Sequence, residues 1–168
     1  MTHLILASSS PRRAEILTSL GIPFEIAPAD VDETFVPGES GREAARRFAR
    51  EKAAAGAARH PDDWVLAADT LVLLDGAILG KPRDDADAAR MLRQLSGREH
   101  CVVTALALKK GPGPGAEAVA GSFTNVMGLP ARTVYRLLRE SPDPALVRLA
   151  LAFSPASSRT FGHPLRKA

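Results

Sequence analysis

The sequence predicts an α/β fold in which helices flank a mixed sheet. Short apolar runs alternate with amphipathic stretches through the first two thirds of the chain, and helix-capping or turn residues separate most of them. A chain of 168 residues, 45% hydrophobic and 24% charged, is long enough to bury one substantial core. We therefore expect one α/β domain.

The first strand and helix are predicted over residues 4–7 and 11–21. The helix has Ser10 in the N-cap position, Pro11 at its first position and Gly21 after its last turn. Proline is suited to a first helical turn because its missing N–H would have no partner there. A strand followed directly by a helix is thus expected at the start of the chain.

A second strand is expected over residues 23–29, followed by an acidic stretch and a Pro/Gly loop. A long helix is expected over residues 40–60, because Ser40 and Glu43 have the spacing of a capping box. This helix has the most secure start signal in the chain.

Residues 64–82 predict a strand that a polar Asp-Thr pair breaks, a tight turn at Asp75 and Gly76, and a short return strand. A helix is expected over residues 84–97, where acidic residues at the start suit the helix dipole and a glycine suits the end. Another strand is expected over residues 100–110.

The pattern changes after Lys110. Residues 111–121 have the composition of a flexible or turn-rich connector, and a short helix is expected over residues 129–140. From Ser141 onward the sequence predicts no firm structure. The expected organisation is one domain over residues 1–140 and a tail over residues 141–168.

Composition excludes several classes of protein. The chain has 22 basic and 19 acidic residues and a net charge of +3, so it is not a polycation that coats nucleic acid, and small anions are favoured as partners. Cys101, the single cysteine, rules out a disulfide framework and is expected to pack as a small hydrophobe. No secretory leader or membrane span is apparent, which predicts a cytoplasmic protein without a membrane partner.

The stretch SSSPRR lies where the first strand is expected to end and the first helix to begin. A helix N-terminus presents unpaired N–H groups, so Ser8, Ser9 and Ser10 at that point predict an anion cradle. The positive charges of Arg12 and Arg13 interact unfavourably with the helix dipole at that end. Their guanidinium groups nevertheless have the right shape to bind phosphate oxygens. The alternative is that Ser10 only caps the helix and both arginines are solvated.

Two lysines and two carboxylates extend this candidate site. Lys52 ends the polar face of the long helix, and Lys81 lies between a glycine and a proline. The alternative is that both are ordinary solvated lysines. Asp69 interrupts an apolar strand, where a buried carboxylate needs a cationic partner. With Glu33 it predicts a Mg²⁺ site beside the phosphate loop, unless Asp69 caps a turn and Glu33 is surface charge.

Six ordered motifs resemble the Maf family of nucleoside triphosphate pyrophosphatases. They are ILASSSPRRAEIL, DVDE, AREKA, VLAADTLVLLDGAILGKP, DADAARMLRQLSGREHCVVTALAL and GSFTNVMGLP. The resemblance implies a cytoplasmic enzyme that hydrolyses nucleoside triphosphates to monophosphate and pyrophosphate with a divalent metal, Mg²⁺ or Mn²⁺. It also implies an elongated mixed sheet, similar to the inosine triphosphatase fold, with a central cleft between two lobes.

The resemblance also implies roles for individual residues. Asp69 matches the proton acceptor, and Glu33 matches an acidic residue on the metal side, so both are candidate metal ligands. The phosphate-binding positions correspond to Ser8, Ser9, Arg12, Arg13, Lys52 and Lys81. Arg12 and Thr70 match the specificity positions of the branch that prefers dTTP and UTP.

One region departs from the family pattern. Residues 109–120 replace a longer segment that carries a glutamine specificity marker and a lysine near the substrate, so the second lobe is expected to be truncated. This keeps two alternatives open: a non-catalytic nucleotide-binding or septum-related regulatory protein that has lost part of its cleft, and a damaged coding sequence whose product folds poorly. A homodimer is a further option.

Overall fold

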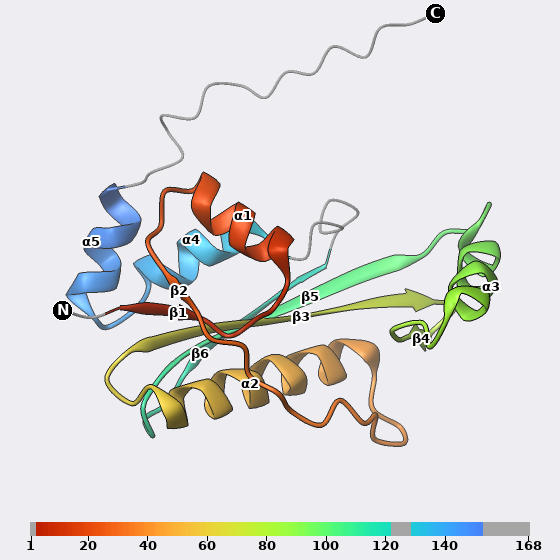
Figure 1. Ribbon diagram of the computed structural model, residues 1–168, viewed down its shortest axis with the longest axis horizontal. Helices are drawn as coiled ribbons and strands as arrows, with labels where there is room; N and C mark the ends of the chain where they lie inside the picture. Colours follow the sequence, from red (N-terminus) through yellow and green to blue (C-terminus); the bar gives the residue numbers. More distant parts are fainter. Residues whose placement is uncertain (1–2, 122–128, 153–168) are drawn as a thin grey trace, which may run out of the picture.

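The computed structural model describes residues 3–121 and 129–152, which form a mixed sheet with helices on both faces (Figure 1). The helices are α1 (Pro11–Ser19), α2 (Gly41–Arg59), α3 (Asp85–Leu95), α4 (Ala131–Arg139) and α5 (Pro144–Ala152). The strands are β1 (Leu4–Leu6), β2 (Glu25–Ile26), β3 (Trp64–Leu74), β4 (Ala77–Leu79), β5 (Cys101–Lys110) and β6 (Ala116–Gly121). The predicted α/β class is confirmed.

The sheet has the strand order β2-β1-β3-β5-β6, and β4 pairs with β3 outside this path. β1 runs parallel to β2 and β3, whereas β5 runs antiparallel to both of its neighbours, β3 and β6. β3 and β5 pair from Trp64 opposite Lys110 to Leu73 opposite Cys101. Their far halves extend beyond the other helices and carry β4 and α3, which makes the molecule elongated (Figure 1).

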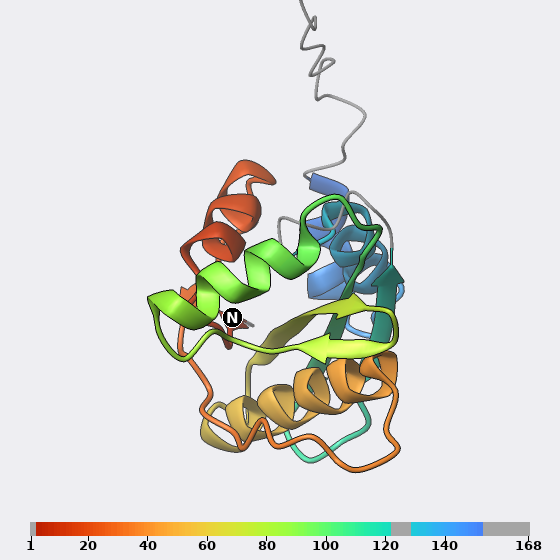
Figure 2. The same cartoon turned by 90° about the vertical axis from the view of Figure 1, so that its right-hand side faces the viewer.

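Alternate residues of the strands build two cores, one on each face of the sheet. Leu4 and Leu6 of β1 pack with α1, α4 and α5, whereas Ile5 of the same strand packs with α2. Figure 2 shows the resulting layers, with α2 on one side of the sheet and α1, α4 and α5 on the other. Period-2 alternation in a sheet that is covered on both faces explains why β1 is apolar at every position.

The α2 layer lies close to the sheet because its buried face consists mainly of small residues. A Cβ atom built on Gly56 would lie 2.7 Å from Val65 Cγ1 of β3, a distance that side chains do not tolerate. The alanine-rich sequence around Gly56 therefore sets the distance at which α2 presents its polar side chains to β3.

Most predicted element boundaries are confirmed. Ser10 is the N-cap residue of α1, with Pro11 at the first helical position, although the Ser10 side chain makes no capping hydrogen bond. The capping box of α2 is complete in both directions between Ser40 and Glu43. Asp75 and Gly76 both have positive φ, 50° and 80°, as a two-residue hairpin turn between β3 and β4 requires.

Two predictions about the strands were wrong. β3 is not broken at Asp69 and Thr70, because both residues stay in register with β5 and their side chains find polar partners beside the strand. The predicted connector over residues 111–121 contains strand β6, which pairs with β5 from Ala116 to Gly121. Small residues gave little local strand signal there, and the open edge of β5 supplies the hydrogen bonds.

Three other expectations concern the C-terminal half. Cys101 is exposed rather than packed, because it begins β5 at the far end of the β3–β5 arm. Residues 144–152, in the segment with no firm structure predicted, form α5, whose Leu146 and Ala150 are buried in the core with α4. Most of the motif GSFTNVMGLP lies outside the described residues.

Candidate functional site

The candidate site lies at a gap in the sheet beside β3. On the side opposite β5, β1 pairs with residues 64–66 of β3 and β4 pairs with residues 72–74. Between them, no strand of the described chain pairs with β3 on this side. Asp69 and Thr70 therefore lie on a stretch of strand that is open at its edge, next to the end of β1 and the start of α1.

Arg13 of α1 occupies this gap. Its Nη1 donates to the backbone carbonyl oxygen of Ala68 at 2.8 Å and to Ser8 Oγ at 3.0 Å, and its Nη2 donates to Thr70 Oγ1 at 3.3 Å. The guanidinium thus satisfies a carbonyl that a neighbouring strand would otherwise pair. Burial lowers the pKa of Arg13, and the carboxylates of Asp69 and Glu33 offset part of this effect.

Lys52 of α2 reaches the same gap from the opposite face of the sheet. Its Nζ lies 2.6 Å from Asp69 Oδ1 and 2.8 Å from Glu33 Oε1, so one ammonium group joins two carboxylates. The Lys52 and Asp69 side chains are only 12% and 9% exposed. Lys52 is therefore a largely buried cation in the site and not a solvated lysine.

Glu33 also binds Lys81, which follows β4. Lys81 Nζ lies 2.9 Å from Glu33 Oε2, and its side chain is 84% exposed. Partial burial alone would raise the pKa of Glu33, but the hydrogen bonds from Lys52 and Lys81 outweigh it, so the pKa lies below the usual value. Glu33 is therefore ionised and forms ion pairs with both Lys52 and Lys81.

These side chains surround a cavity of about 290 Å³. This volume is at the lower limit of small-molecule sites, which range over about 300–1,000 Å³. The predicted residues that line the cavity are Ser8, Ser9, Ser10, Arg13, Glu33, Lys52, Asp69, Thr70 and Lys81. Ser8 is buried against Arg13, whereas Ser9 is exposed at the mouth.

Arg12 is the predicted site residue that the structure does not bring into the cavity. It is exposed on the first turn of α1 and is absent from the cavity lining of the described chain. Successive residues of a helix point about 100° apart, so two neighbouring arginines cannot both face the gap.

Two residues near the site were missed. Thr104 of β5 is fully buried, and its Oγ1 lies 3.0 Å from Thr70 Oγ1. Asp69 was predicted because it is a polar residue within an apolar strand, and Thr104 is a polar residue within another apolar strand. Asp30 also lines the cavity, but nothing in the acidic stretch around it distinguishes it from its neighbours.

A divalent metal fits part of this donor set. Among the described residues, Asp69 Oδ2 is the buried side-chain oxygen or nitrogen atom without a hydrogen-bond partner, and Glu33 lies close to Asp69 across Lys52. No group of three His, Cys, Asp or Glu residues in the described chain could hold a metal ion. Two carboxylates completed by water and phosphate oxygens are a donor set that Mg²⁺ accepts.

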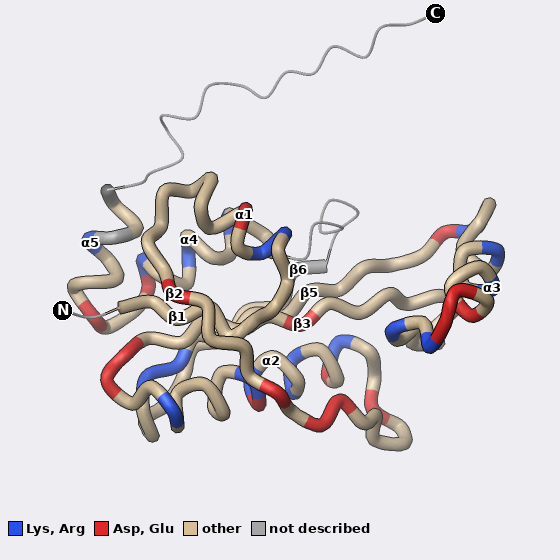
Figure 3. Tube along the Cα trace, in the orientation of Figure 1, with Lys and Arg blue, Asp and Glu red and all other residues tan. Residues whose placement is uncertain are grey.

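Charge over the rest of the described chain is mixed. Figure 3 shows Lys and Arg interspersed with Asp and Glu along α2 and around α3, so neither helix presents a purely basic surface. Among the described helices, none is both long enough and apolar enough to span a membrane.

Comparisons with known proteins agree with the motifs. The family model described as "Maf-like protein" matches residues 3–117. The dTTP/UTP pyrophosphatase of Anaeromyxobacter dehalogenans is 56% identical over 108 residues, which are 64% of this chain and 54% of that protein. The dTTP/UTP pyrophosphatase of Myxococcus xanthus is 54% identical over 107 residues, 64% of this chain and 55% of that protein. The chain spans about half the length of the curated relatives it matches.

Solved structures are more distant. The Ham1 protein of Staphylococcus aureus is 15% identical with a TM-score of 0.47, covering 71% of this chain and 69% of that one. A HAM1 protein from Coxiella burnetii is 21% identical with a TM-score of 0.45, covering 72% of each chain.

Proposed function

This chain belongs to the Maf-like protein family, and on that basis we propose that it hydrolyses nucleoside triphosphates, dTTP and UTP above all, to monophosphate and pyrophosphate. The observation that carries the proposal is the Lys52 ammonium between Asp69 and Glu33, beside Arg13 and the serines of the α1 N-terminus. The names of the relatives support the reaction and the two pyrimidine substrates. A cytoplasmic location is part of the proposal.

The phosphates bind at the N-terminus of α1. Backbone N–H groups at a helix start attract anions, and Ser8 and Ser9 lie directly before it. Lys81 reaches the cavity mouth with a largely exposed ammonium group, which can move from Glu33 to a phosphate oxygen at little desolvation cost. Arg13 fixes the floor of the cavity, and Arg12 reaches the substrate from outside it.

Asp69 accepts the proton of the attacking water. Its Oδ1 is held by Lys52, which leaves the unpartnered Oδ2 to orient a water molecule. The water oxygen bonds to the α-phosphorus as the bond from that phosphorus to the bridging oxygen breaks. Pyrophosphate leaves with the bond's electrons, and the proton passes to Asp69 and then to solvent.

Glu33 and Asp69 are the residues that would hold a divalent cation, Mg²⁺ or Mn²⁺. When bound, such an ion neutralises charge on the phosphates. Side chains of this chain supply the other contacts. Lys52 holds Asp69 and Glu33 together, and Thr70 contacts Arg13 at the cavity wall.

A second candidate function is nucleotide binding without turnover. The small cavity favours it, together with the short segment of residues 109–120, which the family resemblance implies should be longer. In this case the residues around Arg13 would retain a phosphate, and the truncated lobe would leave the reacting groups open to solvent.

Product analysis distinguishes these functions. The purified chain is incubated with dTTP or UTP and Mg²⁺ or Mn²⁺, and the products are separated by chromatography. Equal amounts of monophosphate and pyrophosphate support the proposed reaction. Diphosphate with phosphate excludes it, and calorimetric binding without products identifies a non-catalytic protein. A cooperative thermal melt of the same sample shows that the chain is folded.

A further inference from the structure

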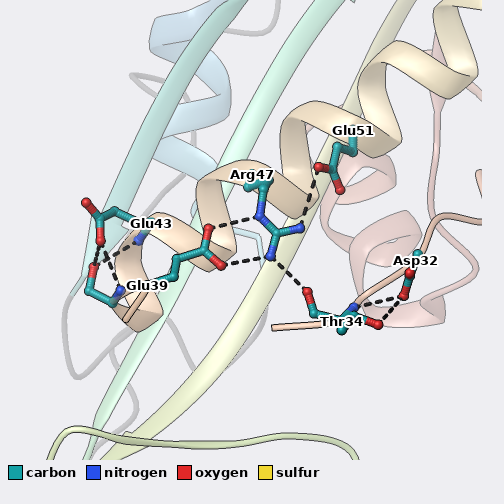
Figure 4. Close-up of polar contacts among 7 residues, drawn as sticks. Asp32, Thr34, Glu39, Glu43, Arg47 and Glu51 are labelled. Carbon is teal, nitrogen blue, oxygen red and sulfur yellow. Dashed lines mark hydrogen bonds and ion pairs between the residues drawn. The ribbon is translucent and has the colours of Figure 1, made fainter. Parts of the chain in front are cut away.

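The loop between β2 and α2, which carries Glu33, lies against α2. Arg59 of α2 binds the start of the loop by donating to the Pro28 carbonyl oxygen at 2.7 Å, and Arg47 binds the part that follows Glu33. Arg47 donates from Nε and Nη2 to the two carboxylate oxygens of Glu39, at 2.9 and 2.7 Å. The same Nη2 donates to the backbone carbonyl oxygen of Thr34 at 2.9 Å. Figure 4 shows the Arg47 guanidinium between Glu39, Thr34 and Glu51, so it contacts both ends of the loop segment 34–39 and its own helix.

The turn at Asp32 adds a second constraint on Glu33. Asp32 Oδ1 accepts hydrogen bonds from the Thr34 backbone N–H at 3.0 Å and from the Thr34 hydroxyl at 2.5 Å. These bonds close a short turn with Glu33 between its two ends (Figure 4). Because Arg47 holds the carbonyl of Thr34, it fixes this turn relative to α2.

Apolar contacts support the same arrangement. The rings of Phe35 and Phe48 meet edge to face with centroids 5.5 Å apart. The Arg47 guanidinium lies 4.5 Å from the centroid of the Phe48 ring. Phe48 is buried in the α2 core, so the loop and the guanidinium rest on one rigid side chain.

We propose that Arg47 is a positioning residue that holds the Glu33 loop on α2, so that the Glu33 carboxylate meets Lys52 and Lys81. Lys52 lies on the same helix as Arg47, so Arg47 fixes the loop backbone while Lys52 receives the loop's carboxylate. The Glu33–Lys81 pair is largely exposed and contributes little to ordering the loop, and the Glu33–Lys52 pair joins the carboxylate, not the loop backbone, to α2. The planar fork of Arg47 supplies the order, and a lysine cannot replace its three contacts.

Hydrogen exchange tests this without any substrate. Arg47→Gln and Arg47→Lys are expected to speed amide exchange in residues 31–36 while leaving β3 and the centre of α2 protected. The matched control is Arg46→Gln, because Arg46 is exposed on the same helix and pairs with Glu117 of β6 at 3.5 Å rather than with the turn at Asp32 and Thr34. Unchanged exchange in residues 31–36 of both Arg47 variants would overturn the proposal.

The effect on catalysis rests on the proposed function and needs a double-mutant cycle. Arg47→Gln is expected to lower kcat/KM for dTTP about 10- to 100-fold, the usual effect of losing a residue that orients a ligand. In a Glu33→Gln background, the same change should alter kcat/KM by no more than about twofold, because Arg47 acts through Glu33. A full additive loss in that background would overturn the proposal.

These experiments distinguish failure of the proposed reaction from failure of the proposed role of Arg47. If the unsubstituted chain releases no pyrophosphate, the proposed reaction is wrong, and the exchange measurement alone decides the role of Arg47. If turnover is present and Arg47→Lys retains full activity, the fork geometry is irrelevant and Arg47 is not the positioning residue.

Discussion

The Lys52 ammonium lies 2.6 Å from Asp69 Oδ1, and this contact joins α2 to the part of β3 that lacks a neighbouring strand on one side. Both side chains are largely buried, so each depends on the other for its charge balance. The same ammonium holds Glu33 from a separate loop. The site is therefore assembled around Lys52, although a lysine on the polar face of a helix usually lies in solvent.

Replacing Lys52 should destabilise the fold as well as stop turnover. Lys52→Met leaves Asp69 buried without its cation, and removing one partner of a buried pair costs about 3 kcal/mol or more. Urea unfolding measures this loss. Lys110→Met is the control, because Lys110 lies 3.8 Å from Asp143 in a more exposed pair and should cost less than about 1 kcal/mol. Equal costs would mean that Lys52 has no special role.

Asp69→Asn tests the proton acceptor. The amide keeps the size of the side chain but cannot take a proton, so kcat for dTTP should fall about 10²-fold or more. Stability is measured on the same sample, so that a folding defect is not mistaken for a catalytic one. A folded variant with nearly unchanged turnover would remove Asp69 from the mechanism.

The two adjacent arginines of α1 should behave differently. Arg13→Ala removes the donor to Ala68, Ser8 and Thr70 and should lower both the melting temperature and nucleotide affinity. Arg12→Ala should leave stability within about 0.5 kcal/mol, or raise it slightly, while weakening the interaction with substrate by about 1.5–3 kcal/mol. Thermal melts and steady-state kinetics separate these effects. A lower melting temperature with unchanged kinetics in Arg12→Ala would make that residue structural.

Asp143 should make the fold sensitive to acid. Hydrogen bonds from the Trp64 indole and the Ala145 backbone N–H lower its pKa in the folded protein. A lowered folded-state pKa stabilises the protein above the unfolded value of about 3.9, and that stabilisation is lost as pH falls through the folded value.

The measurement is the melting temperature of Asp143→Asn against pH. The gap between the unsubstituted chain and this variant should be largest above about pH 5 and should shrink as the pH falls below about 4. Asp62→Asn is the control, since Asp62 is exposed on a loop. A gap that stays constant with pH would mean that Asp143 contributes no titrating interaction.

Base selectivity should be modest. The residues proposed for phosphate and water all precede β5. The family resemblance implies that residues 109–120 replace a longer segment that carries a specificity marker. Without polar partners for the base, discrimination depends on shape and apolar contact, about 10- to 200-fold at best. Measuring kcat/KM for dTTP, UTP, dCTP, CTP and purine triphosphates tests this. Discrimination above about 10⁴-fold would require a complete base pocket.

Local sequence signals predicted the elements that depend on neighbouring residues. The capping box of Ser40 and Glu43 and the turn at Asp75 and Gly76 are short-range hydrogen-bonding and backbone requirements, and both lie where they were expected. Strand β6 was not predicted, because its small residues form a strand only when β5 offers an open edge.

In the candidate site too, local sequence predicted some features and tertiary structure decided others. By itself, the sequence determined which residue types could bind phosphate and metal, because a buried carboxylate and arginines at a helix start need partners that ordinary surfaces do not offer. Only the tertiary structure decided that Arg13 enters the gap beside β3 while Arg12 points outward, and that Lys52 is buried between Asp69 and Glu33. The reason is geometric: the rotation of α1 and the distance of α2 from the sheet depend on packing between residues far apart in the chain.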